Sequence, residues 1–578
     1  MLAITPLIWS SKYLILSLPH VLTCHRFRPC CCRRSKSSRQ PRQELRYRDV
    51  SNRREPCSYG VLIVRIGKGF ATGTIDLGGL LVSQTSSLTK VWATMEGGPD
   101  NLGASFYEPW TLPDGFFMLG SHAQPNNQPL TGWILVGKET SSGALKPPVD
   151  YTLVWNSESL NLKKEGNCYV WYPVPPDGYK AIGYIITNSP NKPPLDKVGC
   201  VRADLTDQCE ADTWIWGQGS IGINLFTSRP STRGIQAQGV SVGTFVASIS
   251  GATTPLSCLK NNGDISSNMP NLDQIKALFE AYSPYIYFHP DEQCLPSSVN
   301  WFFSNGALLY HKGIESNPVL VHPNGTNLPQ GGANDGEYWL DLPQDKAGKD
   351  RVTKGDLLST EAYLHVKTMY GGTLTDIVVW LFYPFNGSSR FKVKFVKNIE
   401  LGKIGKHVGD WEHMTLRISN FNGELNKVYF SQHGGGTWVD ASNLEFITGN
   451  KPIGYSSFRG HAMYSKPGLV LQGRKGVGVQ NEAAKSEMKM DTGVRYSIVA
   501  AEHLGNGIIE PPWLNYTRKW GPKIDYDIKS ELKKVEKFLI GKLKFTFKKV
   551  VESLPNEILG EDGPTGPKMK NNWSGDEV

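Results

Sequence analysis

The sequence has no apolar run of the length, about 20 residues, that a membrane-spanning helix needs. Its two apolar runs near the start, residues 2–9 and 13–18, are short and are separated by Lys12. Later segments offer no candidate either. The chain is therefore not expected to be transmembrane, and a role at a membrane would have to be peripheral.

The sequence also lacks an excess of basic charge outside its first 57 residues. Twelve of the 62 Lys and Arg residues and three of the 53 Asp and Glu residues lie in residues 1–57. The rest of the chain therefore has 50 basic and 50 acidic residues. Nucleic-acid binding needs a concentrated basic surface, so no nucleic-acid partner is expected. Residues 1–57 form an atypical basic leader, for which disorder, an artefact or an Arg-rich transit peptide are the alternatives.

Cysteine is scarce in the remainder of the chain. Only five of the ten cysteines lie beyond residue 57: Cys168, Cys200, Cys209, Cys258 and Cys294. This sparse set without CxxC spacing indicates reduced intracellular thiols and not the disulfide framework of a secreted protein. A Cys200–Cys209 disulfide is the alternative in an oxidising compartment.

Glycine, proline and aromatic residues are plentiful, with 60 Gly, 37 Pro and 61 Phe, Trp and Tyr residues together. This composition is typical of short strands joined by many turns, so a mainly β protein is expected.

Residues 58–255 carry a weak internal repeat. Residues 103–120 and 166–183 both place a strand-like segment before a Pro-Asp-Gly turn, and residues 222–246 form a fainter third copy. Pro and Gly supply the backbone angles of the turn, so each copy predicts strand, turn, strand. Three such units predict a β-prism-like domain, with an ordinary β-sandwich as the alternative.

Residues 256–270 are predicted to be a linker, and residues 271–555 a second domain. Apolar residues at helical spacing predict a helix over residues 271–282. Six strand-like runs follow, which favour an antiparallel β-sandwich: residues 285–289, 362–367, 377–383, 413–418, 427–431 and 496–501.

A long basic amphipathic pattern covers residues 526–554, where eight lysines alternate with apolar residues. Such a terminal helix either docks on the protein's own core or binds an anionic membrane surface. Residues 556–578 are rich in Gly, Pro and Asp and are predicted to be a flexible tail.

The residues with the clearest chemistry are two histidines and two acids between His407 and His413. In a strand, alternate side chains share a face, so Asp410 and Glu412 would project together, opposite Trp411 and His413. Carboxylates suit Mg²⁺ or Ca²⁺ and imidazole suits transition metals, so His407, Asp410 and Glu412 are candidate ligands of a divalent cation. The alternative is a surface strand whose acids pair with Lys403 and Lys406.

Two further histidines, His433 and His461, follow strand-like runs beside glycine-rich turns and could join the same metal site. A metal-dependent hydrolase would use His407 or His413 as a general base. No nucleophile elbow, phosphate loop or cofactor fingerprint accompanies these residues, so no catalytic residue is assigned and a non-enzymatic role is favoured.

Several segments in order resemble the plant members of the vacuolar protein sorting-associated protein 62 family. They include Arg202-Ala-Asp-Leu-Thr-Asp, Phe382-Tyr-Pro-Phe-Asn-Gly, Tyr455-Ser-Ser-Phe-Arg-Gly-His and Glu510-Pro-Pro-Trp-Leu-Asn. The resemblance covers nearly everything from about residue 60 and leaves out residues 1–57. It implies a part in delivering proteins to the vacuole, without defining a biochemical activity.

A more distant resemblance concerns the second domain. The region from His407 to Glu412, followed by Tyr429-Phe-Ser-Gln-His-Gly, is similar to the metal-binding region of the necrosis-inducing cytolysins of plant pathogens. Those proteins are β-sandwiches that hold a divalent cation and engage membrane sphingolipid sugars. The resemblance implies His407, Asp410 and Glu412 as ligands, and places Asn386 where that family has an aspartate.

Together these observations predict a non-catalytic, vacuolar sorting-related protein of the cytoplasm, peripheral at an endosomal or vacuolar membrane. The expected partners are an anionic membrane or glycolipid surface and protein cargo, with a divalent cation, Mg²⁺ or Ca²⁺, as the expected cofactor. The predicted metal ligands are His407, Asp410, Glu412, His433 and His461. A metal-dependent hydrolase and a cytolysin-like glycolipid-binding protein are the alternatives.

Overall fold

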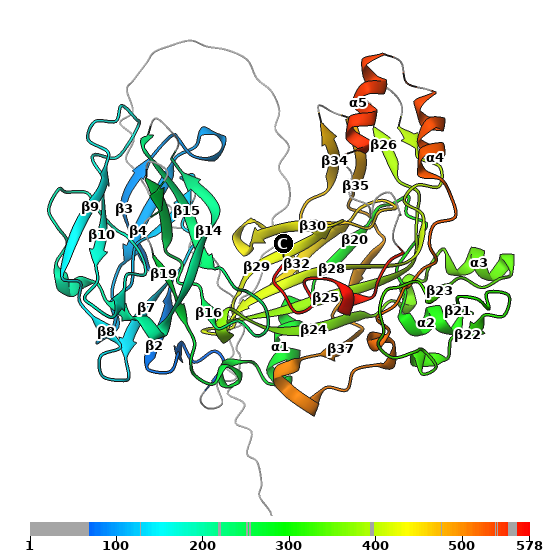
Figure 1. The fold of residues 1–578 in the computed structure, drawn as a ribbon, viewed down its shortest axis with the longest axis horizontal. Helices are drawn as coiled ribbons and strands as arrows, with labels where there is room; N and C mark the ends of the chain where they lie inside the picture. Colours follow the sequence, from blue (N-terminus) through cyan, green and yellow to red (C-terminus); the bar gives the residue numbers. More distant parts are fainter. Residues whose placement is uncertain are drawn as a thin grey trace, which may run out of the picture. The chain divides into compact units, whose positions relative to one another are not determined.

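The structure is a computed structural model that describes residues 69–577, except 128, 218–220, 250–251, 254–255, 393–397, 475–476, 538, 540 and 553–562. The predicted leader, residues 1–57, lies outside the described residues. The mainly β class is confirmed, because strands form most of the regular structure (Figure 1). Among the described residues, none of the helices combines the length and apolar character that crossing a membrane requires.

Small antiparallel sheets form the part of the chain between residues 74 and 260. The first is β1 (Thr74–Asp76), β2 (Leu80–Thr85), β7 (Ile134–Glu139) and β5 (Phe117–Met118), and the second is β3 (Leu88–Thr94), β4 (Ala104–Pro109) and β6 (His122–Pro125). The third is β12 (Ile185–Thr187), β10 (Tyr169–Val174) and β9 (Asp150–Asn156), and the fourth is β11 (Tyr179–Lys180), β13 (Cys200–Arg202) and β8 (Leu145–Lys146). The largest is β16 (Gly239–Val240), β19 (Ser257–Lys260), β14 (Thr206–Trp216), β15 (Ile223–Pro230), β17 (Phe245–Ile249) and β18 (Ala252–Thr253).

The three copies of the sequence repeat share one aromatic core. Phe245 of the third copy contacts Phe106 of the first copy and Tyr184, the residue directly after the second copy, with ring centroids 5.9 and 5.8 Å apart. The copies also meet at their ends, where a Cβ on Gly183 would lie 2.8 Å from both Gly120 and Thr244. This convergence supports three related units, while the prism arrangement itself stays a prediction.

One disulfide differs from the expected cysteine chemistry. Cys209 of β14 is bonded to Cys258 of β19, and their Cα atoms lie 5.2 Å apart. The pairing of Asp207 with Cys258 in the two strands brings these cysteines together. The predicted Cys200–Cys209 alternative is therefore wrong, because Cys200 lies in β13 of another sheet and is free and buried. The strand β19 also occupies part of the predicted linker.

The second part of the chain is built on a six-stranded sheet, in which all five of the predicted strand runs beyond residue 300 lie. Its order is β30 (Gly435–Asp440), β29 (Leu425–Gln432), β28 (His407–Ser419), β25 (Leu374–Asn386), β24 (Ala362–Met369) and β37 (Tyr496–Ala500). The pair β24–β37 is parallel and departs from the antiparallel expectation. A parallel pair requires a long connection, and here residue 362 pairs with residue 496.

Three smaller sheets accompany this sheet. They are β31 (Phe446–Ile447), β32 (Lys451–Ser456), β20 (Tyr285–Phe288) and β36 (Lys489–Asp491), with β33 (Met463–Tyr464) beside β32; β22 (Val319–Leu320), β21 (Leu308–His311) and β23 (Tyr338–Asp341); and β27 (Ile399–Glu400), β26 (Arg390–Lys392), β35 (Val477–Ala483) and β34 (Gly468–Arg474). Two short helices, α2 (Val299–Ser304) and α3 (Lys346–Val352), lie in the same part of the chain. The antiparallel sandwich arrangement stays a prediction.

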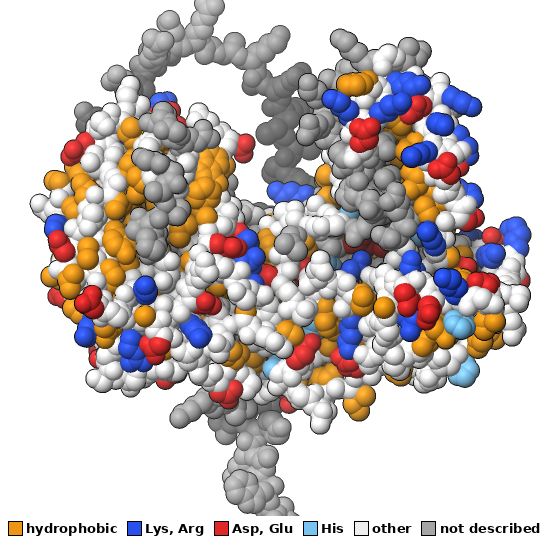
Figure 2. Space-filling model, in the orientation of Figure 1, with side chains coloured by type: hydrophobic (Ala, Val, Ile, Leu, Met, Phe, Trp, Pro, Cys, Tyr) orange, Lys and Arg blue, Asp and Glu red, His pale blue; other side chains and the backbone are white. Residues whose placement is uncertain are grey.

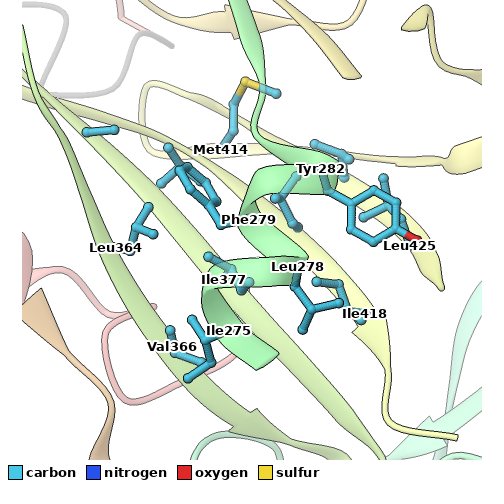
Figure 3. Packing of buried hydrophobic residues seen from close by; sticks show 14 of the residues in the cluster. Ile275, Leu278, Phe279, Tyr282, Leu364, Val366, Ile377, Met414, Ile418 and Leu425 are labelled. Carbon is cyan, nitrogen blue, oxygen red and sulfur yellow. The ribbon is translucent and has the colours of Figure 1, made fainter. Parts of the chain in front are cut away.

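The predicted helix at residues 271–282 is confirmed as α1 (Leu272–Tyr282). Asn271 and Gln274 form a reciprocal capping box that satisfies the free N–H groups at its start. Its buried face packs on the six-stranded sheet, where Ile275 and Phe279 lie among side chains of β24, β25 and β28 (Figure 3). The helix therefore covers part of one face of the sheet.

The predicted helix over residues 526–554 is two helices, α4 (Ile528–Glu536) and α5 (Lys542–Val551). Gly541 lies between them with φ +56°, a backbone conformation that interrupts a right-handed helix. Leu539 and Phe547 pack with Phe391 of β26 and Val479 of β35. Docking on the protein's own core is therefore confirmed, and lysines gather on the outer side (Figure 2).

Candidate functional site

The strand β28 carries the predicted site residues and has the predicted alternation. On one face, Met414 packs in the core beneath α1, and on the other face Trp411 contacts Trp513 and Trp520. Asp410 and Glu412 share the face of Met414, because alternate residues of a strand point the same way. The local backbone requires Gly409, whose φ is +68° and whose added Cβ would lie 2.5 Å from the Trp520 carbonyl oxygen.

A pocket of about 230 Å³ opens beside the first half of β28. Its cause is the strand pairing: β29 pairs with β28 only from Met414 to Ile418 and leaves the earlier residues without this neighbour. Four of the five predicted ligands line the pocket, namely His407, Asp410, Glu412 and His433. The strand and its departing neighbour therefore bring together residues that are distant in the sequence.

The fifth predicted ligand, His461, lies behind the pocket wall. Its Nδ1 is 2.9 Å from Asp410 Oδ2, and its fully buried ring stacks on Tyr383 at 3.9 Å. The buried Nε2 of His461 has no hydrogen-bond partner among the described residues. His461 therefore orients Asp410 from the protein side.

The ionisation of Asp410 and His407 suits cation binding. Burial alone raises the pKa of Asp410, but the hydrogen bond from His461 and the charges of His407 and His461 outweigh it, so the pKa lies below its ordinary value. Burial lowers the pKa of His407. The carboxylate and the neutral imidazole are the forms that bind metals.

The remaining candidates already have protein partners. Glu412 accepts a hydrogen bond from Ser431 at 2.5 Å, and His433 Nε2 lies 3.0 Å from Asn481 Oδ1. Among residues 69–577 as far as they are described, no three His, Cys, Asp or Glu side chains are grouped so that they could hold a metal ion. The pocket thus gathers the predicted ligands without forming a metal centre, and metal binding stays a prediction.

The surface-strand alternative fits less well. Lys403 pairs with Asp525 at 3.3 Å and not with the acids of β28.

Asn386, which the cytolysin resemblance singles out, also lines the pocket; its amide donates to the Gly405 carbonyl at 2.8 Å. The buried Oδ1 of Asn386 has no partner in the described part of the chain, so an oxygen ligand is available there.

The sequence prediction missed one wall of the pocket, the acidic segment (Asn571–Glu577). Asn571, Asn572 and Glu577 line the pocket. The Glu577 carboxylate accepts from Thr415 at 2.5 Å and lies 3.1 Å from His413 Nε2. Residues 563–577 are described and Glu577 is buried, so the flexible-tail prediction for residues 556–578 is wrong there. The missed signal was Trp573 close to two consecutive acids.

We expect Glu577 to make the stability of the protein pH-dependent. Burial raises the pKa of Glu577, but the charge and hydrogen bond of His413, with the charge of Lys367 and the Thr415 hydrogen bond, lower it from 4.5 to about 2. A lowered carboxyl pKa stabilises the fold above the unfolded-state pKa, and this stability is lost as the pH falls from 4.5 to about 2. Glu577→Gln should remove about 3 kcal/mol of this pH-dependent stability.

The measurement is urea unfolding of both proteins at several pH values between 6 and 2, a range chosen to span that interval. The free energy of unfolding should fall less steeply with decreasing pH in Glu577→Gln than in the unmodified protein. Glu280→Gln, at an exposed position of α1, is the matched control and should keep the original slope. Equal slopes for all three proteins would contradict the assignment.

The chain matches the family model described as vacuolar protein sorting-associated protein 62 over residues 60–577. A protein of that name from Saccharomyces cerevisiae is 25% identical over 217 residues, which cover 32% of this chain and 44% of the yeast protein. The match therefore spans less than half the length of this relative.

Similar solved structures include GNIP1Aa from Chromobacterium piscinae, with 19% identity over 34% of this chain and 40% of that chain and a TM-score of 0.26. NLPPya in complex with glucosamine has 13% identity over 37% and 74% of the two chains and a TM-score of 0.20. Necrosis and Ethylene inducing Protein 2 from the causal agent of cocoa's Witches Broom disease has 14% identity over 34% and 69%, with a TM-score of 0.19. Similarity at this level does not indicate a shared ligand or activity.

Proposed function

The chain belongs to the vacuolar protein sorting-associated protein 62 family, and from this premise we propose that it is a non-catalytic binding protein in vacuolar protein sorting, with a divalent cation in its pocket. Family membership itself points to a sorting-related role. The observation that carries the cation proposal is that His407, Asp410, Glu412 and His433 line one pocket.

The chemistry of the pocket favours Mg²⁺ or Ca²⁺ with water completing the coordination shell. Asp410 and Glu412 offer carboxylate oxygens on one face of β28, and the Asn386 Oδ1 is an amide oxygen without a partner among the described residues. Oxygen ligands of this kind are those that hard cations prefer. Glu412 and His433 are hydrogen-bonded to Ser431 and Asn481 in the structure. To bind the cation, their side chains would have to rotate away from these partners toward a shared centre.

Cation binding is tested by isothermal titration of the purified chain with MgCl₂ and CaCl₂. We expect one bound ion, and an affinity lowered more than about tenfold in His407→Ala and in Asp410→Ala. The bound ion should also raise the melting temperature, because it binds only the folded state.

The matched controls are His322→Ala and Asp273→Ala, which remove the same side-chain types at exposed positions away from the pocket. They should bind the cation as the unmodified chain does. The proposal fails if the unmodified chain binds neither ion, or if all four variants lose affinity equally.

We further propose that α4 and α5 bring the protein to an anionic membrane surface. Lys529 and Lys533 of α4 and Lys537, just after that helix, are exposed. Phe545 of α5 is 61% exposed, and Lys549 Nζ lies 4.7 Å from the centroid of its ring. Lysines attract anionic lipids, and an exposed aromatic ring enters the interface. Figure 2 shows basic side chains gathered over this part of the molecule.

Vesicle flotation tests the membrane proposal. The chain should float with phosphatidylserine vesicles and not with phosphatidylcholine vesicles, and Lys533→Glu with Lys537→Glu should abolish flotation. Lys276→Glu with Lys346→Glu, at exposed sites on α1 and α3, is the control with the same charge change. Equal losses in the two double variants, or no flotation of the unmodified chain, would refute this docking face.

A further inference from the structure

The face of the six-stranded sheet opposite α1 carries an unusual number of buried polar side chains. The residues involved, all at most 8% exposed, are His365 and Lys367 of β24, Asp376 of β25, and His413, Thr415 and Arg417 of β28. Buried charges destabilise a fold unless partners satisfy them. The sheet itself supplies one such partner, because Asp376 accepts two hydrogen bonds from Arg417, at 2.8 and 2.7 Å.

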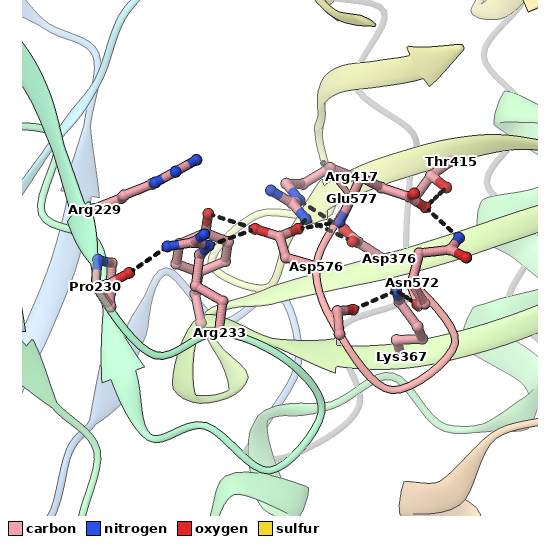
Figure 4. Close-up of polar contacts among 12 residues, drawn as sticks. Arg229, Pro230, Arg233, Lys367, Asp376, Thr415, Arg417, Asn572, Asp576 and Glu577 are labelled. Carbon is pink, nitrogen blue, oxygen red and sulfur yellow. Dashed lines mark hydrogen bonds and ion pairs between the residues drawn. The ribbon is translucent and has the colours of Figure 1, made fainter. Parts of the chain in front are cut away.

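The acidic segment supplies most of the other partners (Figure 4). Asp576 accepts from Arg417 at 2.5 Å and from Tyr370 at 3.1 Å, and Arg233 lies 3.3 Å away. Lys367 donates to the carbonyl oxygens of Asn572 and Gly575. With the Glu577 contacts to His413 and Thr415, one short stretch of chain satisfies most of this polar face. His365 has a different polar partner, because its Nε2 lies 2.8 Å from Glu502 Oε1.

The segment lies on the sheet as a separate ligand would. No strand of the described residues pairs with it, and its own backbone forms turns, with Trp573 N–H donating to Lys570 O and Gly575 N–H to Asn571 O. One backbone hydrogen bond, from Ile235 to Ser574, adds to the side-chain contacts. A peptide that is not part of this strand network can form the same contacts.

The contacts of the face favour an occupant with one aromatic ring and two carboxylates. The Trp573 ring stacks on His365 with centroids 3.8 Å apart, and three residues later the two carboxylates meet Arg417, His413 and Thr415. Within the sheet, Asp376 is the one carboxylate that pairs with Arg417. Lys367 has no carboxylate partner within the sheet. Positive charge therefore remains for an incoming acidic group.

We propose that this face, the acidic-peptide groove, is a docking site for a partner protein's acidic peptide that carries an aromatic residue three positions before two consecutive acids. The chain's own acidic segment is its resident ligand, and the partner's peptide displaces it. The groove is a third interaction surface beside the cation pocket and α4–α5, and it is inferred from contacts other than those that support these two proposals.

Docking changes the pocket as well, because the two share a wall. Asn571, Asn572 and Glu577 line the pocket, while Glu577 and the Asn572 carbonyl contact the sheet. Exchange of the segment removes these groups from the pocket and replaces them with those of the partner. Peptide docking and ligand binding in the pocket are therefore coupled.

The test uses a fluorescein-labelled peptide with the sequence of residues 568–577, Lys-Met-Lys-Asn-Asn-Trp-Ser-Gly-Asp-Glu. It is titrated into the full-length chain and into full-length Asp576→Asn, Glu577→Gln, whose resident segment is weakened. Fluorescence anisotropy should show at least tenfold tighter binding to the double variant. Arg233→Ala in that background should weaken binding again, because it removes a cation beside Asp576.

The matched control peptide carries Asn and Gln in place of the two acids and should bind at least tenfold more weakly. The proposal is overturned if both peptides bind equally, or if the acidic peptide binds neither chain.

A second measurement needs no variant. Hydrogen–deuterium exchange of residues 571–577 in the unmodified chain should rise with the acidic peptide at about 1 mM, a concentration comparable to that of a tethered segment. The neutral peptide should leave exchange unchanged. Unchanged exchange with both peptides would show that the segment does not leave the groove and would refute displacement.

Discussion

Arg417→Ala is expected to lower the free energy of unfolding by about 3–5 kcal/mol, the usual cost of breaking a buried ion pair. The guanidinium is 1% exposed, pairs with Asp376 and Asp576, and lies 4.1 Å from the ring centroid of Trp438. Burial lowers the pKa of Arg417, but the two carboxylates more than compensate and hold it well above its ordinary value. Its removal leaves the fully buried Asp376 without a counter-charge.

Chemical unfolding followed by circular dichroism measures this loss. Arg229→Ala is the control, since Arg229 is 31% exposed and pairs with Glu210 and Asp212 at the surface. Its loss should cost less than about 1 kcal/mol. Adding Asp376→Asn to Arg417→Ala should restore part of the stability, because it removes the unpaired charge. Equal losses for Arg417→Ala and Arg229→Ala would contradict the buried pair.

Trp520→Ala is expected to cost about 3–5 kcal/mol as well, by leaving a cavity in the core. Trp520 is fully buried, and its ring contacts Phe382, Trp411 and Trp513, with centroids 5.3, 5.2 and 6.1 Å apart. These rings pack on one face of the first half of β28, and Asp410 lies on the opposite face of the same strand. We therefore expect cation binding in the pocket to weaken together with stability.

Trp110→Ala is the matched control for the tryptophan substitution. Trp110 is 70% exposed, so its truncation should change the free energy of unfolding by no more than about 0.5 kcal/mol. Thermal unfolding of Trp520→Ala and Trp110→Ala measures the change in stability, and cation titration of both variants measures the change in affinity of the pocket. A stable Trp520→Ala protein with an unchanged pocket would show that the aromatic core does not support the site.

Local patterns in the sequence were enough to predict much of the fold. Apolar residues at helical spacing predicted α1, and strand-like runs predicted strands at each of the six named positions. These signals depend only on neighbouring residues. The alternation that separates Asp410 from Trp411 is a signal of the same kind and is present in β28.

Features that depend on distant residues were not predictable in this way. The disulfide partner of Cys209 follows from the pairing of β14 with β19, and spacing alone does not contain that register. The same holds for Arg417, Asp376 and Asp576, which only the folded sheet brings together. The periodicity of residues 526–554 is the same for one helix or two, so the break before α5 was missed.

The parallel pairing of β24 with β37 has a consequence for how the protein matures. Ala362 finds its partner Tyr496 only after the intervening chain has been synthesised, so the edge of the sheet remains open on the nascent polypeptide. Non-local pairing of this kind slows folding, and an open apolar edge invites aggregation. Efficient production of this protein in cells should therefore depend on chaperones that hold the growing chain until β37 has left the ribosome.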